Sequence, residues 1–422
     1  MKRPIIIALL IAGLVLVGTR IGTISFFTGR PLPFVTLEES KTIKVDVESR
    51  VKLKVNNAAG SVTIIGADVK TIQVNTVKTG HDLTQTGAEK VVKTIQYTIE
   101  QTGNMITIRY KLPNTDVWDI NLNTVDFMIT VPNETTVNVY NNIGEVGISN
   151  IKGDAIITND FGEVKVDNIE GALSVSNNGG DVNASSIKAS HEDIELNTDF
   201  GAVTLKNASG SNITLDSNAG TIMLQEVHAT GNITTDGGNT SFENSSTTSL
   251  RVTNSGALTL KKVRASKEIM VQDDFGEIEV EQTTAAFYEL HTNRGSIAVD
   301  GVKGNLKVST DFGGINIQNA QSVRLDLKTK SGSVHFSGSL GEGPHTVESD
   351  FGEIVLTFPA EAKLNVDLKT DFGNIDSELP ITVVTNGSSG SDGDQIIGSI
   401  NGGGEQLTVQ TNSGSININI GK

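Results

Sequence analysis

Apolar residues alternate with polar ones along most of the chain, and glycine interrupts the alternation at regular intervals. The turn glycines are 18 to 21 residues apart up to Gly373, and Gly414 follows after a longer gap. Apolar residues occupy the second and fourth positions after most of these glycines, as Val164 and Val166 do after Gly162. A period of two is typical of a strand that buries one face. Each repeat therefore predicts a strand, a glycine turn, a second strand and a polar connection.

A repeat this short cannot bury its apolar face alone, whereas stacked copies share a continuous core. Leucine-rich repeats of similar length need a leucine signature and a helical return, and this sequence has neither. We therefore predict an all-β fold, a single-chain parallel β-solenoid (β-helix) of about 14 coils over residues 141–422. Residues 36–140 lack the period and are expected to form an N-terminal β cap over the open end. A Gly/Ser-rich stretch at about 386–406 is expected to be a loop.

The polar residue two positions before each turn glycine alternates between Asn and Asp. Equivalent residues of successive coils stack about 4.8 Å apart, so unbroken carboxylates would repel one another. An Asn between two Asp residues doubles their separation and offers them an amide donor. Phe follows the Asp in most Asp coils, and a small residue follows the Asn in several Asn coils, so we predict that the Phe side chains fill alternate layers. We also predict one structural ladder, made of Asn142, Asp160, Asn178, Asp199, Asn218, Asp236, Asn254, Asp274, Asn293 and Asp311.

The triplet Asp-Phe-Gly would hold catalytic magnesium in a protein kinase. It occurs six times, beginning at Asp160, Asp199, Asp274, Asp311, Asp350 and Asp371. A kinase site needs only one such triplet, together with a Val-Ala-Ile-Lys strand and a His-Arg-Asp loop that this sequence lacks. The triplet is therefore a mark of repetition and not of a kinase site.

The Asn/Asp alternation slips after Asp311. Lys330 is expected to pair with Asp311 and Asp350, whereas Asp350 and Asp371 would stack directly with Glu353 nearby. A bound Ca²⁺ would relieve this crowding, because hard cations take oxygen ligands. A raised carboxyl pKa or a local splaying of the coils would relieve it equally well. Asp350, Asp371 and Glu353 are thus weak metal candidates, and we predict no required cofactor.

The N-terminus carries a targeting signal. Lys2 and Arg3 precede an apolar run from Pro4 to Gly18, the pattern of an export signal. As a helix the run spans about 22 Å, and apolar residues up to Phe27 extend it toward the length of a membrane span. We predict that residues 1–28 form a hydrophobic helix, an uncleaved signal anchor in the cell membrane. The positive-inside rule then places the bulk of the chain outside the cytoplasm. A cleaved signal peptide and a secreted protein remain the alternative.

Composition narrows the possible functions. The net charge of −16 argues against nucleic-acid binding, which needs a basic surface. The absence of Cys excludes disulfides, Cys-ligated zinc and thiol catalysis, and the six His residues show no zinc-binding spacing. The acidic residues that the repeat allows us to place lie mainly in the regular ladder, whereas glycan hydrolysis needs a separate pair of carboxyl groups. We predict no catalytic residues, no cofactor-binding residues and no enzyme activity.

These features resemble a family of bacterial proteins. The apolar N-terminus, the strand sequence MITVP at residues 128–132 and the repeated Asp-Phe-Gly-Glu turns are similar to those of the putative-adhesin family, which includes LiaG-like envelope proteins. The resemblance covers about residues 40–420. It implies a β-solenoid on the outer side of the membrane, common in Gram-positive bacteria, with no catalytic residues to transfer.

We therefore predict a non-enzymatic, membrane-anchored extracytoplasmic protein with an adhesin-like, binding or structural role in the cell envelope. A cell-wall polymer, a glycan or an envelope protein would be its partner. Two alternatives remain open from the sequence. One is a polysaccharide-active β-helix enzyme, either a lyase or a hydrolase, and the other is an accessory protein of an envelope-stress response.

Overall fold

The computed structural model describes residues 23–26, 30–46, 49–112, 123–389 and 393–421. The hydrophobic helix predicted for residues 1–28 lies outside these ranges, apart from residues 23–26, which form strand β1. No helix within the described ranges is long and apolar enough to cross a membrane. The chain divides into two compact units, residues 1–220 and 221–422.

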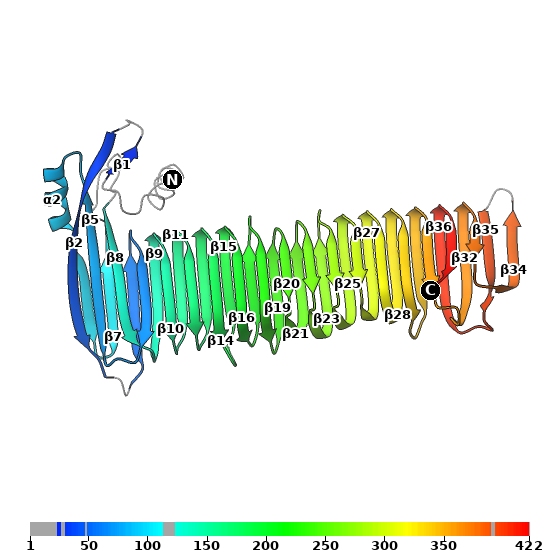
Figure 1. Ribbon diagram of the computed structural model, residues 1–422, viewed down its shortest axis with the longest axis horizontal. Coiled ribbons are helices and arrows are strands. Elements are labelled where there is room, and N and C mark those ends of the chain that lie inside the picture. The colour runs from blue at the N-terminus through cyan, green and yellow to red at the C-terminus, as the bar shows by residue number, and fades with distance from the viewer. Residues whose placement is uncertain (1–22, 27–29, 47–48, 113–122, 390–392, 422) are drawn as a thin grey trace. The chain divides into compact units, whose positions relative to one another are not determined.

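Within its described residues, the first unit consists of β-strands and one helix (Figure 1). Its elements are β1 (Thr23–Phe26), β2 (Arg30–Lys44), β3 (Val51–Asn57), β4 (Val62–Ala67), β5 (Thr71–His81), α2 (Gln85–Thr94), β6 (Tyr97–Thr102), β7 (Met105–Tyr110), β8 (Thr124–Pro132), β9 (Thr135–Ile143), β10 (Val146–Ile151), β11 (Ala155–Phe161), β12 (Val164–Ile169), β13 (Leu173–Gly179), β14 (Val182–Lys188), β15 (Ile194–Phe200), β16 (Val203–Gly210) and β17 (Ile213–Ser217).

Parallel pairing between equivalent strands builds the coils of this unit. Strand β11 pairs in parallel with β9 and β13, and β12 pairs in parallel with β10 and β14. Alternate residues of each strand are buried, so Val164 and Val166 of β12 lie in the core with the aligned Val182 and Ala184 of β14. This is the inward face that the alternation predicts.

The parallel stack begins before residue 141. Strand β3 pairs in parallel with β9, and β4 pairs in parallel with β10, so these two strands form a coil in register with the repeats. The other strands of residues 36–140 include antiparallel pairs, such as β2 with β5 and β6 with β7. Helix α2 begins after Thr84, whose side chain accepts a hydrogen bond from the Gly87 N–H (3.0 Å). The helix lies against β2 and β5 and buries Ala88 and Val92 (Figure 1).

Glycine closes each coil at a tight turn. Gly162 has a φ of +137°, and a Cβ built on it would lie 2.1 Å from the carbonyl oxygen of Gly144 in the preceding coil. Only glycine fits that contact and that backbone conformation. A second corner, six residues further on, places one residue in the left-handed region. Asn150 and Asn168 occupy this corner with φ of 60° and 54°, and the Asn168 amide donates to Asn150 Oδ1 (2.8 Å).

Within the described residues of the second unit, β-strands and the turns between them make up the fold. They are β18 (Ile222–Ala229), β19 (Asn232–Gly237), β20 (Thr240–Glu243), β21 (Ser246–Asn254), β22 (Leu258–Lys261), β23 (Arg264–Asp273), β24 (Ile278–Glu281), β25 (Thr284–Arg294), β26 (Ile297–Asp300), β27 (Lys303–Phe312), β28 (Ile315–Ser331), β29 (Val334–Leu340), β30 (His345–Phe351), β31 (Ile354–Phe358), β32 (Leu364–Phe372), β33 (Ile375–Ser377), β34 (Ile381–Ser389), β35 (Gly393–Ile400), β36 (Glu405–Ser413) and β37 (Ile416–Ile420).

The coil order of the second unit departs from the sequence order near its C-terminal end. Strand β36 pairs in parallel with both β30 and β32, so it lies between them, and β37 lies in the same way between β31 and β33. In Figure 1 the red β36 stands beside the orange β32. Strands β34 and β35 form an antiparallel hairpin on β32, and the part of the predicted loop at 386–406 that the structure describes includes β35.

The prediction of an all-β parallel solenoid is confirmed, with about 12 turns instead of about 14. The described residues contain one helix, α2, which the sequence analysis did not predict.

Candidate functional site

Polar side chains lie in straight rows on the coils, because equivalent residues are in register. In the first unit Asn142, Asp160, Asn178, Asp199 and Asn218 form such a row, here called the outer row. Asn178 Nδ2 donates to Asp160 Oδ1 (3.0 Å) and Asn218 Nδ2 donates to Asp199 Oδ1 (2.8 Å). Burial raises the pKa of the Asp160 carboxyl above its ordinary value. In both pairs, the Asn amide donates a hydrogen bond to the Asp carboxylate of the preceding coil.

The outer row of the second unit begins at Asp274. Asn293 Nδ2 donates to Asp274 Oδ1 (3.0 Å), and Lys330 Nζ forms an ion pair with Asp311 Oδ2 (2.8 Å). In spatial order the row consists of Asp274, Asn293, Asp311, Lys330, Asp350, Asn412 and Asp371.

Two residues of the predicted ladder, Asp236 and Asn254, do not belong to this row. Asp236 is in register with Thr253 and not with Asn254. Asn254 is buried and in register with Asp273. The reason is turn length, because three residues separate Asn254 from β22 where four separate Asp273 from β24. Counting back from the glycine therefore reaches a different strand position in this coil, and the prediction of strict alternation over ten coils is wrong here.

The direct stacking of Asp350 on Asp371 is also wrong. Strand β36 inserts Asn412 between them, and Asn412 Nδ2 donates to Asp350 Oδ1 (3.3 Å). Glu353 Oε1 accepts a hydrogen bond from Asn417 Nδ2 (2.6 Å), and Asp371 Oδ1 pairs with Lys369 Nζ (3.3 Å). The crowding that motivated a Ca²⁺ site is thus relieved by the chain itself. Within the described ranges, no group of three or more His, Asp or Glu side chains is placed to hold a metal ion.

The phenylalanines of the Asp-Phe-Gly turns do not fill alternate layers of the core. Phe161 is half-buried, and the others are exposed, namely Phe200, Phe275, Phe312, Phe351 and Phe372. The strand alternation ends at the buried residue three positions before the glycine, and the two residues that follow both lie on the outside of the corner. The predicted packing role is therefore wrong, and these rings are on the surface.

A buried row that the sequence analysis missed lies just inside the outer row. We call it the inner row, and in the first unit it includes Asn141, Asn159, Asn177, Thr198 and Ser217. Each occupies the position three before the turn glycine, so the signal was present in the sequence as a column of Asn, Thr and Ser.

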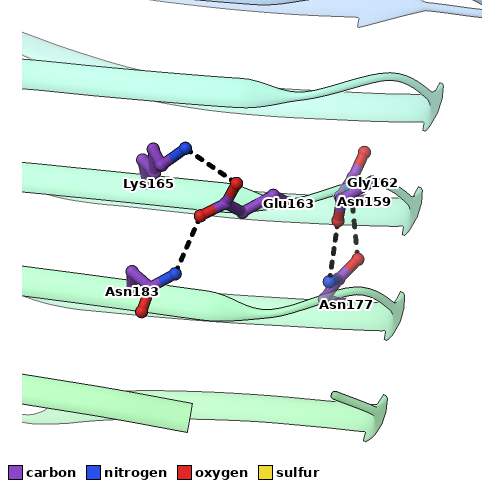
Figure 2. Close-up of polar contacts among 6 residues, drawn as sticks. All are labelled: Asn159, Gly162, Glu163, Lys165, Asn177 and Asn183. Carbon is purple, nitrogen blue, oxygen red and sulfur yellow. Dashed lines mark hydrogen bonds and ion pairs between the residues drawn. The ribbon is translucent and has the colours of Figure 1, made fainter. Parts of the chain in front are cut away.

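Hydrogen bonds explain why the inner row is polar. Asn159 Nδ2 donates to the Gly162 carbonyl (3.0 Å). Figure 2 shows the two bonds of Asn177: its Oδ1 accepts from Asn159 Nδ2 (3.1 Å), and its Nδ2 donates to the Gly162 carbonyl (3.0 Å). In the second unit a buried carboxylate, Asp273, takes this place. Its oxygens accept from Asn254 Nδ2 (3.1 Å), Thr292 Oγ1 (3.0 Å) and a backbone N–H, while burial raises its pKa. The side chains of the inner row form hydrogen bonds with buried backbone groups of the turns, so the role of this row is structural.

A groove of about 430 Å³ lies on the outward face of β4, β10, β12, β14 and β16 in the first unit. Two neighbouring rows of outward side chains line it, among them Lys165, Asp167, Asn183 and Ser185. Gly147 is aligned with Thr63 on one side and Lys165 on the other. Because glycine contributes no side chain, the row is hollow at that point.

Hydrogen bonds hold the polar groups of the groove in place. Glu163 accepts from Lys165 Nζ at Oε2 (2.7 Å) and from Asn183 Nδ2 at Oε1 (2.9 Å), as Figure 2 shows. The hydrogen bond to Glu163 raises the pKa of Lys165, and Asp167 Oδ1 accepts from Ser185 Oγ (2.6 Å). The groove offers fixed ammonium, amide, hydroxyl and carboxylate groups on a flat sheet, which suits hydrogen bonding to a polar ligand.

Parallel coils with glycine turns and polar rows define a β-solenoid repeat protein. Residues 246–419, all in the second unit, match the protein family Toastrack DUF4097, which confirms the family resemblance over that stretch. No curated protein matches the chain.

Two solved structures were also matched. A putative cell adhesion protein from Clostridium sporogenes ATCC 15579 is 12% identical, with a TM-score of 0.22, over 92% of this chain and 100% of its own. A putative adhesin from Bacteroides fragilis NCTC 9343 is 13% identical, with a TM-score of 0.26, over 67% of this chain and 97% of its own. At these TM-scores neither structure bears on the fold or function of this chain.

Proposed function

We propose that this chain is a non-enzymatic, adhesin-like protein that binds a polar polymer of the cell envelope. The groove over β4, β10, β12, β14 and β16 is the observation that carries this proposal. Its side chains come from successive coils, so the outward positions recur about every 4.8 Å along it and most of them carry a polar group. A cell-wall polymer or glycan, which repeats its hydroxyl and amide groups, is the kind of ligand that such a surface fits.

The pairing of the carboxylates supports a binding role over catalysis. Asp160, Asp199 and Glu163 each accept a hydrogen bond from an Asn amide. A glycosidase instead needs one carboxyl group raised in pKa and a second one facing it across the substrate. Burial raises the pKa of Asp160 and of Asp273, but Asp160 accepts from the amide of Asn178 and Asp273 accepts from Asn254, Thr292 and a backbone N–H.

We place the protein at the membrane, outside the cytoplasm. The support is the sequence of residues 2–18, in which two basic residues precede a continuous apolar run. The anchor would hold the coils at the cell surface, where wall polymers are accessible.

Filling the groove tests the proposal. Gly147→Phe would place a ring between Thr63 and Lys165. The backbone tolerates the change, since a Cβ at Gly147 meets nothing closer than Thr63 at 4.0 Å. Bound and free fractions of the full chain would be measured on purified wall fractions. We expect Gly147→Phe to lower binding at least about tenfold, equivalent to 1.4 kcal/mol.

The matched control is Thr214→Phe, which adds the same ring at an exposed position of β17 outside the groove. It should bind like the unmodified chain. Equal binding by both variants, or turnover of wall polysaccharide that a single acidic substitution abolishes, would contradict the proposed function.

A further inference from the structure

Four exposed phenylalanines lie in one row of the second unit. Their exposed fractions are 63% for Phe275, 60% for Phe312, 64% for Phe351 and 74% for Phe372. Large apolar side chains are seldom left in water in a regular array without a binding role.

The phenylalanines alternate with small or polar residues along this row, here called the aromatic row. In spatial order it consists of Phe275, Arg294, Phe312, Ser331, Phe351, Ser413 and Phe372. The insertion of β36 is what places Ser413 between the last two rings. Phenylalanine therefore recurs at every second coil, about 9.6 Å apart, and the four rings span about 29 Å.

The outer row runs directly beside the aromatic row. Each exposed ring has an acidic neighbour, from Asp274 beside Phe275 to Asp371 beside Phe372, and the coils between them contribute Asn293, Lys330 and Asn412. Carboxylates and amides thus border every ring.

The combination of exposed rings with neighbouring carboxylates and amides indicates which class of ligand fits the two rows. Four Asp residues against Arg294, whose guanidinium lies 5.7 Å from the Phe275 ring centroid, and Lys330, which pairs with Asp311, leave the two rows net acidic. This disfavours anionic polymers and anionic membranes, and a second copy of this chain, with its net charge of −16, would bring its own acidic row. A neutral sugar ring packs a C–H face on an aromatic ring and offers hydroxyls to carboxylates and amides. In an extended β-1,4-linked polysaccharide, successive sugars are rotated by half a turn, so the same face recurs at every second sugar. That disaccharide repeat is comparable with the two-coil repeat of the rings.

We propose that the aromatic row and the outer row of the second unit form a binding site for a neutral, extended β-1,4-linked polysaccharide, with one disaccharide for each pair of coils. This inference rests on the proposed function as a polymer-binding protein and names the class of polymer. It uses a surface separate from the groove of the first unit.

Chitohexaose and cellohexaose are the probes for this site, and binding to the full chain is measured by titration calorimetry. We expect both hexaoses to bind at least about tenfold more tightly than the corresponding disaccharides, because a hexaose reaches several rings. Maltohexaose, whose α-linked chain curls, should not bind. The double variant Phe312→Ser with Phe351→Ser should lower hexaose affinity at least about tenfold.

Serine occupies the same row at Ser331 and Ser413, so the double variant keeps a residue type that these coils accept. Val384→Ser, which removes an apolar side chain that is 78% exposed elsewhere in this unit, is the matched control and should bind hexaose normally.

The outcomes separate this site from the proposed function. If the chain binds wall fractions through the groove but binds neither hexaose, or binds hexaose equally without Phe312 and Phe351, the polysaccharide site is overturned and the proposed function stands. Ring-dependent binding to anionic vesicles or to a protein in place of a glycan also overturns it. Hexaose binding that needs the rings supports the site even if Gly147→Phe leaves wall binding unchanged.

Discussion

At the scale of single residues, close approach between coils restricts what each corner accepts. The turn glycines face the carbonyl oxygens of the preceding coil, and the second corners hold residues with left-handed φ. The first contact admits no side chain, whereas the second corner only disfavours most of them. Substitutions at the two corners should therefore change the free energy of unfolding by different amounts and in opposite directions.

Gly162→Ala should destabilise the first unit strongly. The new Cβ would lie 2.1 Å from the Gly144 carbonyl oxygen, at a φ of +137°. We expect a loss of at least about 2 kcal/mol in the free energy of unfolding, measured by urea denaturation. Gly147→Ala, where the nearest contact is 4.0 Å, is the control and should lose no stability. Equal effects of the two changes would refute the close-approach explanation.

Lys262→Asn should stabilise the second unit. Lys262 has a φ of 54°, a conformation that Asn tolerates better than Lys. The expected gain is about 0.5–1 kcal/mol in urea denaturation. Lys267→Asn makes the same chemical change at an exposed position of β23 and should stay within about 0.5 kcal/mol of the unmodified chain. A loss of stability at Lys262 would show that its side chain makes a compensating contact.

His345 should make the second unit sensitive to acid. Its side chain is buried, Nδ1 accepts from the Leu325 N–H (3.3 Å), and burial lowers its pKa below the ordinary 6.5. Below pH 6.5 the unfolded chain takes up this proton more readily than the folded chain, so stability falls as the pH falls. Denaturation midpoints at pH 8 and pH 5 should differ less for His345→Gln than for the unmodified chain. An unchanged difference would show that other groups dominate.

The sequence predicts the positions of some outer-row residues correctly and those of others wrongly. The outer row follows from counting back from each glycine wherever turns have equal length, as they do at Asp160 and Asn178. The count fails at Asp236 and Asn254, because their turns are shorter and nothing in the local composition marks the missing residue. The exposure of Phe312 could not be predicted from alternation, which applies to strands and ends at the corner.

At the scale of strands, the inner row links neighbouring coils. Each buried amide bonds a corner carbonyl and, in several coils, the next amide along the row. The buried groups of this row find their hydrogen-bond partners within the protein. Removing one side chain of the row therefore leaves buried donors or acceptors without a partner. The side chains of the outer row are half-buried or exposed, so their hydrogen bonds can be exchanged for bonds to water.

Asn159→Ala should therefore cost much more than Asn178→Ala. The first change removes donors to the Gly162 carbonyl and Asn177 and an acceptor for Asn141, all buried. We expect a loss of about 2–4 kcal/mol, against about 0.5–1 kcal/mol for the exposed Asn178–Asp160 bond. Urea denaturation of both variants measures the difference. Asn159→Thr, the residue type found at Thr198, should recover part of the loss. Similar costs for Asn159→Ala and Asn178→Ala would contradict the difference between the rows.

At the scale of the whole molecule, the sequence indicates the repeat but not its full connectivity. The predicted order assumes that consecutive coils are neighbours, which holds along β11, β13 and β15. It fails where β36 inserts between β30 and β32. The longer gap after Gly373 marks an irregularity, but a gap in the period does not tell where the chain returns.

A charge in the inserted strand should disrupt the second unit. Val409 is fully buried between Val347 of β30 and Leu368 of β32. Val409→Asp should cost at least about 3 kcal/mol and expose the facing edges of β30 and β32. Limited proteolysis and size-exclusion chromatography should then reveal cleavage within residues 364–400 and aggregation. Gln410→Asp, on the exposed side of the same strand, should show neither, and a well-behaved Val409→Asp variant would contradict the role given to β36.

The placement of β36 also affects biosynthesis. A ribosome makes β30 and β32 before β36, so the two strands emerge with no partner for their facing edges until residues 405–413 follow. Elsewhere along β11, β13 and β15, each new coil can dock on the one just completed during translation. Here the order of synthesis and the order in space differ, so this end of the second unit can be completed only after residues 405–413 have been made.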